Sequence, residues 1–272
     1  NLHIVFNGEI YNYKELRAEL EAFGISFCTH SDTEVLINTI QQYGEKALDK
    51  LRGMFGFAVW NEKEQTLMLA RDFFGIKPVY YAEIDGHFVF ASEIKSILAF
   101  PGYERKVNQK ALEQYLSFQY SPLEETFFKG IYKLMPGHML LYKNGSYEIK
   151  TYFKPKLTPG QWNHKTNMAQ LRSQLSEILK DSVKHHMLSD VEVGAFLSGG
   201  VDSGYLASSS GADQAFTVGF DEGDRYSEVN KAAKVAEKAG LKHHVKIISK
   251  QEFWDALPDV MYHMDEPLGD AS

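Results

Sequence analysis

The spacing of hydrophobic and polar residues changes once along the chain, near residue 160. In the first part, short apolar runs are separated by polar turns such as Asn61–Glu64 and Asp85–Gly86, which predicts antiparallel strands. Asn144-Gly145 between two further runs predicts a hairpin. The expected strands cover residues 2–12 (ending in a polar turn), 25–28, 55–60, 66–70, 78–82, 87–91, 139–142 and 146–153. The four consecutive runs between residues 55 and 91 predict an antiparallel meander.

Helices interrupt these strands. Apolar residues at helical spacing predict a helix over residues 13–23 that ends at Gly24. A second helix is expected to begin at Ser31 as the N-cap, with Glu34 at the capping-box position, and to run to Tyr43. A third covers residues 108–118, with Asn108 as its cap. Antiparallel strands combined with helices predict an α+β domain.

Beyond residue 165 helices and strands alternate. Helices are expected at residues 168–187, 203–209, 227–239 and 251–261, and strands at 193–197, 215–220 and 244–248. This alternation predicts βαβ units and an α/β domain with a parallel sheet, whose strands are buried apolar runs. We therefore predict two domains, at residues 1–160 and 161–272. Residues 101–161 are expected to be a connector, with the boundary at Thr158–Gln161.

Composition narrows the function classes. A length of 272 residues, 44% of them hydrophobic, supports two folded domains. The net charge of −7 argues against binding to nucleic acid or to an anionic membrane surface, and no apolar run approaches the ~18 residues of a membrane span. The single cysteine, Cys28, excludes a disulfide framework and indicates a reducing, cytoplasmic location. The sequence leaves open whether the chain forms a homodimer.

The stretch Ser198-Gly-Gly-Val-Asp-Ser203 carries the clearest candidate chemistry. It lies between a predicted strand and a predicted helix, where glycines admit a close backbone approach and free N–H groups favour an anion. A carboxylate at Asp202 beside a phosphate is unfavourable unless a cation lies between them, which predicts Mg²⁺. The motif resembles the pyrophosphate-binding loop of the N-type ATP pyrophosphatase superfamily, which implies ATP as the ligand. The alternative is an ordinary strand–turn–helix junction whose glycines serve packing.

Four motifs in the first part follow one another in the order of a known family. They are Asn7-Gly-Glu-Ile-Tyr-Asn12, Ser31-Asp-Thr-Glu34, Arg71–Pro78 and Ala91-Ser-Glu-Ile-Lys95. Together they resemble the glutaminase domain of glutamine-hydrolysing asparagine synthetases, class II amidotransferases with an N-terminal nucleophile hydrolase-like fold.

The resemblance implies roles for four residues of the first part. Asn7 and Gly8 would form an oxyanion hole, for which a side-chain amide and a backbone N–H are suited. Glu9 would help to fix glutamine, and Asp32 would bind its α-amino group. Each site also has a plain alternative, a simple turn at Asn7-Gly8 and a second capping residue at Asp32.

The sequence departs from that family at the nucleophile. Family members use an N-terminal cysteine, whereas this chain begins with Asn1, which cannot be the activated nucleophile. Cys28 lies inside a predicted strand, and we interpret it as a small buried core residue. Because the chain opens within a strand-like run and stops without a cap, we expect a fragment of a longer protein, without glutaminase activity of its own.

The resemblance also covers the second part of the chain. It implies that Leu197 and Val218 contact the adenosine part of ATP; core packing is the alternative for both. Val218 and Gly219 lie at the carboxyl end of a predicted strand, where parallel sheets bind ligands. The ATP and pyrophosphate site is therefore expected to comprise Leu197, Ser198, Gly199, Gly200, Asp202, Ser203, Val218 and Gly219.

Two further features stay open or are set aside. The segment Asp265–Asp270 is similar to one near the family's aspartate site, with a solvated turn as the alternative. The histidine pairs His185-His186 and His243-His244 do not predict a metal site, because neighbouring residues point apart on a helix and on a strand.

The reaction that the resemblance implies uses glutamine, aspartate and ATP. Glutamine would be hydrolysed to ammonia, and ATP with Mg²⁺ would convert aspartate to β-aspartyl-AMP, giving asparagine, AMP, pyrophosphate and glutamate. Two other hypotheses remain: a related amidotransferase that acts on another acid, and a truncated, non-catalytic interaction domain.

Overall fold

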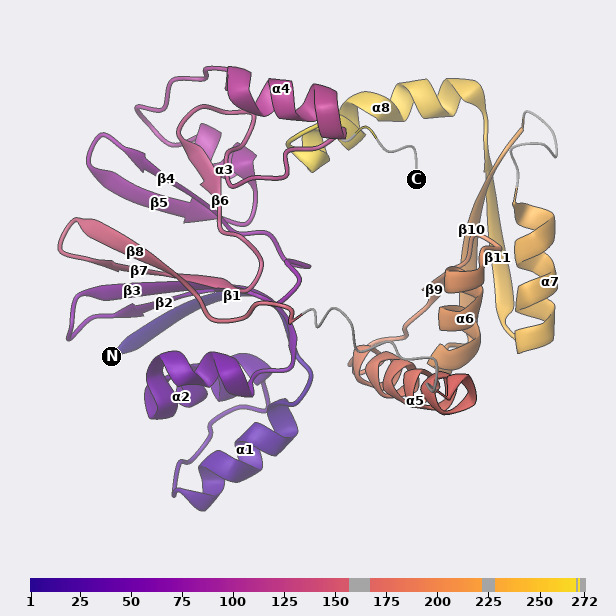
Figure 1. The fold of residues 1–272 in the computed structure, drawn as a ribbon, viewed down its shortest axis with the longest axis horizontal. Helices are drawn as coiled ribbons and strands as arrows, with labels where there is room; N and C mark the ends of the chain where they lie inside the picture. The colour runs from indigo at the N-terminus through magenta and orange to yellow at the C-terminus, as the bar shows by residue number, and fades with distance from the viewer. Residues whose placement is uncertain (157–166, 222–227, 268, 270–272) are drawn as a thin grey trace. The chain divides into compact units, whose positions relative to one another are not determined.

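The computed structural model describes residues 1–156, 167–221, 228–267 and 269. The chain forms two compact units: unit 1 consists of residues 1–157 and 263–272, and unit 2 of residues 158–262 (Figure 1). The boundary expected at Thr158–Gln161 lies outside the described residues.

Unit 1 is built on a five-stranded antiparallel sheet with the strand order β1-β2-β3-β7-β8. The strands are β1 (Leu2–Ile10), β2 (Gly53–Asn61), β3 (Thr66–Arg71), β7 (His138–Lys143) and β8 (Ser146–Thr151). The last two form the hairpin predicted around Asn144-Gly145. Successive residues of a strand point to opposite faces, so Phe57 and Val59 of β2 enter one core and Ala58 enters another.

Helices cover one face of this sheet and a second sheet covers the other (Figure 1). On the helical side lie α1 (Tyr13–Ala22), α2 (Asp32–Tyr43) and the short 3-10 helix η1 (Gly44–Lys50). The second sheet is antiparallel, with the order β5-β4-β6, and comprises β4 (Tyr80–Ile84), β5 (His87–Ala91) and β6 (Ile131–Lys133). Its own strands pack against α3 (Ile94–Leu98) through Ile94 and Ile97. This arrangement agrees with the α+β class expected for the first part.

Two expectations about unit 1 are wrong. The strands between residues 53 and 91 do not form one meander, because β3 pairs with β7 while β4 pairs with β5 and β6. Residues 101–161 are not merely a connector, since β6, β7 and β8 complete the two sheets; α4 (Gln109–Phe118), capped by Asn108 as predicted, also lies in this range. The meander is interrupted at the loop after β3. Backbone groups of this loop form hydrogen bonds with the side chains of Arg71 and Asp72, so the chain leaves the first sheet instead of adding a neighbouring strand to β3.

The expected strand at residues 25–28 and the buried thiol of Cys28 are also wrong. Cys28 is exposed and lies in irregular structure. The Glu34 carboxylate accepts the N–H groups of Cys28 and Thr29 at 2.7 and 2.6 Å, bonds that a neighbouring strand would otherwise supply. Ser31 caps α2 as predicted, by accepting the Thr33 N–H at 3.1 Å. Glu34 does not complete a capping box, because its carboxylate is bound to Cys28 and Thr29.

Unit 2 contains a three-stranded parallel sheet with the order β11-β10-β9. The strands are β9 (Ala195–Phe196), β10 (Gln214–Phe220) and β11 (Lys242–Ile248). The helices that alternate with them are α5 (Met168–His186), α6 (Val201–Ser210) and α7 (Val229–Ala239), followed by α8 (Lys250–Met264). Parallel strands joined by helices agree with the α/β pattern predicted for the second part.

One face of the parallel sheet is packed and the other is open. Leu197 and Ala215 form a core with α6 and α7, whereas Phe196 and Val218 are 87% and 55% exposed. The expectation of a fully buried strand at residues 193–197 is therefore wrong. Of this run, Ala195 and Phe196 pair with β10, and within unit 2 the face of the sheet to which Phe196 points is exposed.

Candidate functional site

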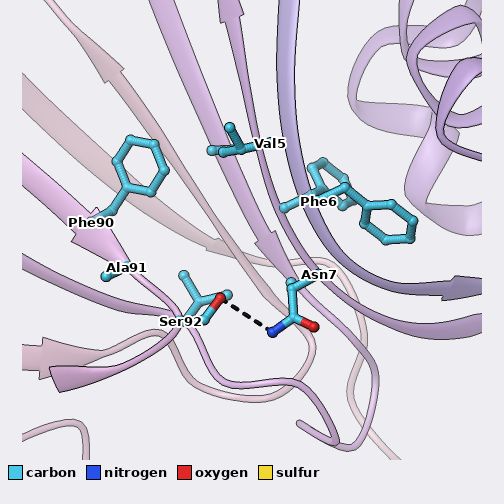
Figure 2. A pocket seen from close by; sticks show the side chains of 10 residues that line it. Val5, Phe6, Asn7, Phe90, Ala91 and Ser92 are labelled. Atoms are coloured by element: carbon cyan, nitrogen blue, oxygen red, sulfur yellow. Dashed lines mark hydrogen bonds between the residues drawn. The ribbon is translucent and has the colours of Figure 1, made fainter. Parts of the chain in front are cut away.

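Asn7 lies in β1 on the face that looks toward the second sheet. Its side chain lines a pocket of about 340 Å³ whose walls come from β1, β2, β5 and the adjoining residues Val79 and Ser92 (Figure 2). The Asn7 Nδ2 group donates a hydrogen bond to the Ser92 Oγ atom at 3.2 Å. The volume is at the lower end of the range for small-molecule sites.

Gly8 and Glu9 continue β1 past Asn7. A Cβ atom at Gly8 would lie 2.1 Å from the carbonyl oxygen of Met54 in β2, so only glycine fits at this position. Asn7 and Gly8 pair with Gly56 and Phe55 in the sheet, and the alternative of a simple turn is therefore wrong.

Asp32 is brought to this segment by α2. Its Oδ2 atom accepts the N–H of Ile10 at 3.0 Å, and the Thr33 hydroxyl donates to its Oδ1 atom at 3.4 Å. The carboxylate thus binds to β1 rather than acting as a second cap of α2, whose cap is Ser31. The fold therefore places Asp32 beside the segment that carries Asn7, Gly8 and Glu9.

Two residues at the junction of β3 and the loop between the two sheets, Arg71 and Asp72, have roles that the sequence reasoning missed. The carboxylate of Asp72, a residue only 1% exposed, accepts four backbone N–H groups, those of Phe55, Phe74, Ile76 and Lys77. The Arg71 guanidinium donates to three carbonyl oxygens, those of Gly75, Lys77 and Leu134, and burial lowers its pKa. The sequence feature that could have indicated these roles is the Arg-Asp pair at the end of an apolar strand. Both residues order the loop, and Val79 at its end lines the pocket.

The Ser198–Ser203 loop joins β9 to α6 in the predicted order of strand, turn and helix. Gly199 has a φ of +77°, and a Cβ atom there would lie 2.7 Å from the Lys231 Cβ atom. The Ser198 and Ser203 hydroxyl oxygens are 2.9 Å apart, and Ser203 Oγ also accepts the Ser198 N–H at 3.3 Å. No described side chain caps α6 at its N-cap, Gly200, so N–H groups of its first turn remain for an external acceptor.

Leu197, Val218 and Gly219 lie close to this loop along the sheet, but the side chains of the first two do not share a face. The Leu197 N–H donates to the Phe216 carbonyl at 2.9 Å, and the leucine side chain is buried against α6 and α7. Gly219 is buried, whereas Val218 is exposed on the open face. Core packing thus describes Leu197 and is wrong for Val218.

Thr217 is a further residue that the sequence reasoning missed. Its hydroxyl donates to the Leu197 carbonyl at 2.6 Å and lies 2.7 Å from the His243 Nε2 atom. The neighbouring His244 instead binds Gln214 at 2.9 Å. Within the described ranges no group of three or more His, Cys, Asp and Glu side chains is arranged to hold a metal ion. In the same part of the chain, no helix is both long enough and apolar enough to cross a membrane.

The segment after α8 packs within unit 1. The Asp265 side chain, 8% exposed, accepts the N–H groups of Ile94 and Lys95 at 2.7 and 3.2 Å and pairs with the Lys95 ammonium at 3.1 Å. Glu266 accepts the N–H of Phe127 at 2.7 Å, and burial raises its pKa. The alternative of a solvated turn is wrong for Asp265 and Glu266; Leu268 and Asp270 lie outside the described residues.

Comparison of the sequence with known proteins identifies the family of this chain. The family model for the glutamine amidotransferase domain matches residues 1–153, and that for asparagine synthase matches residues 174–272. The chain therefore belongs to the glutamine amidotransferase family, and its second part is similar to asparagine synthase. These matches confirm the resemblance inferred from the motifs.

The relatives with similar sequences include asparagine synthetases and, at 30% identity, a Gibberella zeae protein named amidase chry2. The chain is 43% identical to glutamine-hydrolysing asparagine synthetase 1 of Bacillus subtilis, over 98% of this chain and 42% of that protein. It is 32% identical to asparagine synthetase 3 of the same organism, over 97% of this chain and 45% of that protein. The chain thus spans less than half the length of these relatives. The structural match to the glutamine PRPP amidotransferase of B. subtilis covers 90% of this chain and 45% of the amidotransferase chain, at 20% sequence identity. Its TM-score of 0.41 is too low to argue a shared fold.

Proposed function

We propose that the chain belongs to an enzyme that makes asparagine from aspartate, with ammonia from glutamine and with ATP as the energy source. The order of the two family matches carries this proposal: an amidotransferase domain at residues 1–153 precedes asparagine synthase at residues 174–272. The 43% identity to a glutamine-hydrolysing asparagine synthetase supports the same substrates.

Unit 1 binds glutamine beside β1 as an N-terminal nucleophile hydrolase-like glutaminase does, although Asn1 provides no nucleophile and the 272-residue chain by itself should not hydrolyse glutamine. The Asn7 Nδ2 group and the Gly8 N–H stabilise the oxyanion of the tetrahedral intermediate, and Glu9 helps to fix the substrate. Asp32 binds the α-ammonium group. Its carboxylate has about four lone-pair sites, and the bonds from Ile10 and Thr33 leave room for an ammonium.

Unit 2 binds ATP at the Ser198–Ser203 loop. The uncapped start of α6 offers N–H groups to the pyrophosphate, and the paired hydroxyls of Ser198 and Ser203 add donors. Val218 and Gly219 border the adenosine, and Leu197, whose side chain is buried in the core, borders it through its backbone. The aspartate carboxylate attacks the α-phosphorus to give β-aspartyl-AMP and pyrophosphate, and ammonia then displaces AMP.

The residues of the loop fit a magnesium ion. Mg²⁺ is commonly held by one or two carboxylates plus substrate phosphates, and Asp202 supplies one carboxylate in the first turn of α6. Bound there, Mg²⁺ would neutralise charge on the phosphates. Gly199 lets the loop lie against Lys231 of α7, and Gly200 brings no side chain beside the Ser198 and Ser203 hydroxyls, which leaves space there for the phosphates.

Product analysis tests the proposal. The protein expressed from its complete coding sequence would be incubated with glutamine, aspartate and ATP–Mg²⁺, and asparagine, glutamate and AMP would be measured by mass spectrometry. A parallel reaction with ammonium chloride in place of glutamine tests unit 2 separately, and other dicarboxylic acids test the alternative acceptor. Folded protein that forms no asparagine from either nitrogen source would refute the proposal.

A further inference from the structure

Ser92 belongs to a motif that the proposed function leaves without a role. The stretch Ala91-Ser-Glu-Ile-Lys95 leads from β5 into α3, and Ser92 lines the same pocket as Asn7. The two residues are 85 positions apart in the sequence, yet the Asn7 Nδ2 group donates to the Ser92 Oγ atom at 3.2 Å (Figure 2).

We propose that Ser92 is a positioning residue that orients the Asn7 amide toward the oxyanion; this inference rests on the proposed glutaminase function of unit 1. The terminal torsion of an asparagine is broad and nearly two-fold, so packing alone holds the amide plane weakly. The amide nitrogen carries two hydrogens in that plane. When Ser92 accepts one of them, the direction of the other is fixed, and preorganised donors are what an oxyanion hole requires.

The position of Ser92 is itself held from both sides. Ala91, the residue before it, pairs with Tyr80 in the second sheet. The helix α3 that follows is anchored by the fully buried Ile94 and by the Asp265 carboxylate, which accepts the Ile94 N–H at 2.7 Å. The hydroxyl is therefore presented to Asn7 by a fixed backbone.

Asn7 is held equally firmly on the other side of the pocket. It pairs with Gly56 in the first sheet, and the neighbouring Gly8 lies against the Met54 carbonyl. The distance between the two side chains is thus set by the packing of one sheet on the other. A side chain at position 92 without a hydroxyl would leave the Asn7 amide free to rotate.

The first test measures glutaminase activity in the protein expressed from its complete coding sequence. Ser92→Ala should lower kcat about tenfold, the factor that corresponds to loss of ~1.4 kcal/mol or one hydrogen bond, with KM unchanged within about twofold. Ser92→Thr, which keeps the hydroxyl, should restore most of the rate. The matched control is Ser96→Ala, which changes an exposed serine in α3, the helix that follows Ser92, and should behave as wild type.

A double-mutant cycle separates positioning from a merely structural role. Asn7→Ala should cost about 10²–10³-fold in kcat, the usual loss for one oxyanion donor. Once Asn7 is removed, adding Ser92→Ala should change little, because Ser92 acts only through the amide. Fully additive losses, or full kcat in Ser92→Ala beside an active wild type, would overturn this inference alone. Absence of glutaminase activity from the wild type would overturn the proposed function as well.

A spectroscopic test does not depend on activity. In ¹⁵N-labelled 272-residue chain, the Asn7 side-chain amide signals are assigned as those missing from Asn7→Ala. Ser92→Ala should shift both proton signals and bring them closer together, while Ser92→Thr and Ser96→Ala should leave them in place. Unmoved Asn7 signals in Ser92→Ala would show that the hydroxyl does not hold the amide, whatever the enzyme catalyses.

Discussion

Replacing Asp72 by alanine should lower the free energy of unfolding of unit 1 by about 3–5 kcal/mol, in the range of other broken buried charge networks. The change removes the acceptor of four backbone N–H groups at distances of 2.9–3.3 Å. The N–H of Phe55 is buried in β2 and would stay unsatisfied, at a cost of ~1–3 kcal/mol. The three groups in the loop are partly buried and can turn to water, so each should cost less, about 0.5–1 kcal/mol.

Replacing Asp72 by asparagine should give a loss of stability between zero and that of the alanine variant. The Oδ1 atom of Asp72 accepts from Phe74 and Ile76, and Oδ2 accepts from Phe55 and Lys77. An amide keeps one of these oxygens and turns an NH₂ group toward the other pair. Asp72→Asn should therefore cost roughly half as much as Asp72→Ala.

Hydrogen exchange read by mass spectrometry across a urea series would report unit 1 separately, through peptides covering residues 53–80. The matched control is Asp49→Ala, which removes the same charge from an exposed position and should change stability by less than about 0.5 kcal/mol. If Asp72→Ala stayed within that limit as well, the loop would not depend on the carboxylate, and the explanation given for the separation of the two sheets would fail.

The remaining predictions concern unit 2 and the end of the chain. Gly199→Ala should weaken ATP binding and loosen the loop because its Cβ would lie 2.7 Å from Lys231, whereas Gly211→Ala, with a φ of +71° but no atom within 4 Å, should leave calorimetric ATP affinity unchanged. Asp202→Asn should weaken ATP binding in Mg²⁺ but not in a chelator; equal loss in both buffers would refute metal bridging. Ser203→Ala should weaken it in both, by up to ~1.5–3 kcal/mol if the site is buried, and no loss would remove its role. Burial raises the pKa of Glu266 above its ordinary 4.5, so the folded state favours the neutral carboxyl group. The stability that Glu266 contributes should be present below pH 4.5 and decrease as pH rises through the raised pKa. Unfolding curves of Glu266→Gln should lack this decrease in stability.

Local features were readable from the sequence because their partners are neighbours. The N-caps Ser31 and Asn108, the hairpin at Asn144-Gly145 and the strand–turn–helix order around Ser198–Ser203 all depend on contacts between residues a few positions apart. The change from antiparallel strands to alternating helix and strand likewise predicted an α+β part followed by an α/β part. The four motifs between Asn7 and Lys95 together indicated the family through their residue types and their order.

The tertiary structure decided which side chains meet. Ser92 reaches Asn7 and Asp265 caps α3 only because distant segments pack together, and no periodicity encodes a hydrogen bond across 85 or 171 residues. Cys28 is exposed because its segment is not paired in a sheet: the Glu34 carboxylate accepts the Cys28 N–H that a neighbouring strand would otherwise bind. Phe196 is exposed because a period-2 alternation gives each strand two faces, and whether a second face is covered depends on the elements packed beside it and not on the strand's own residues.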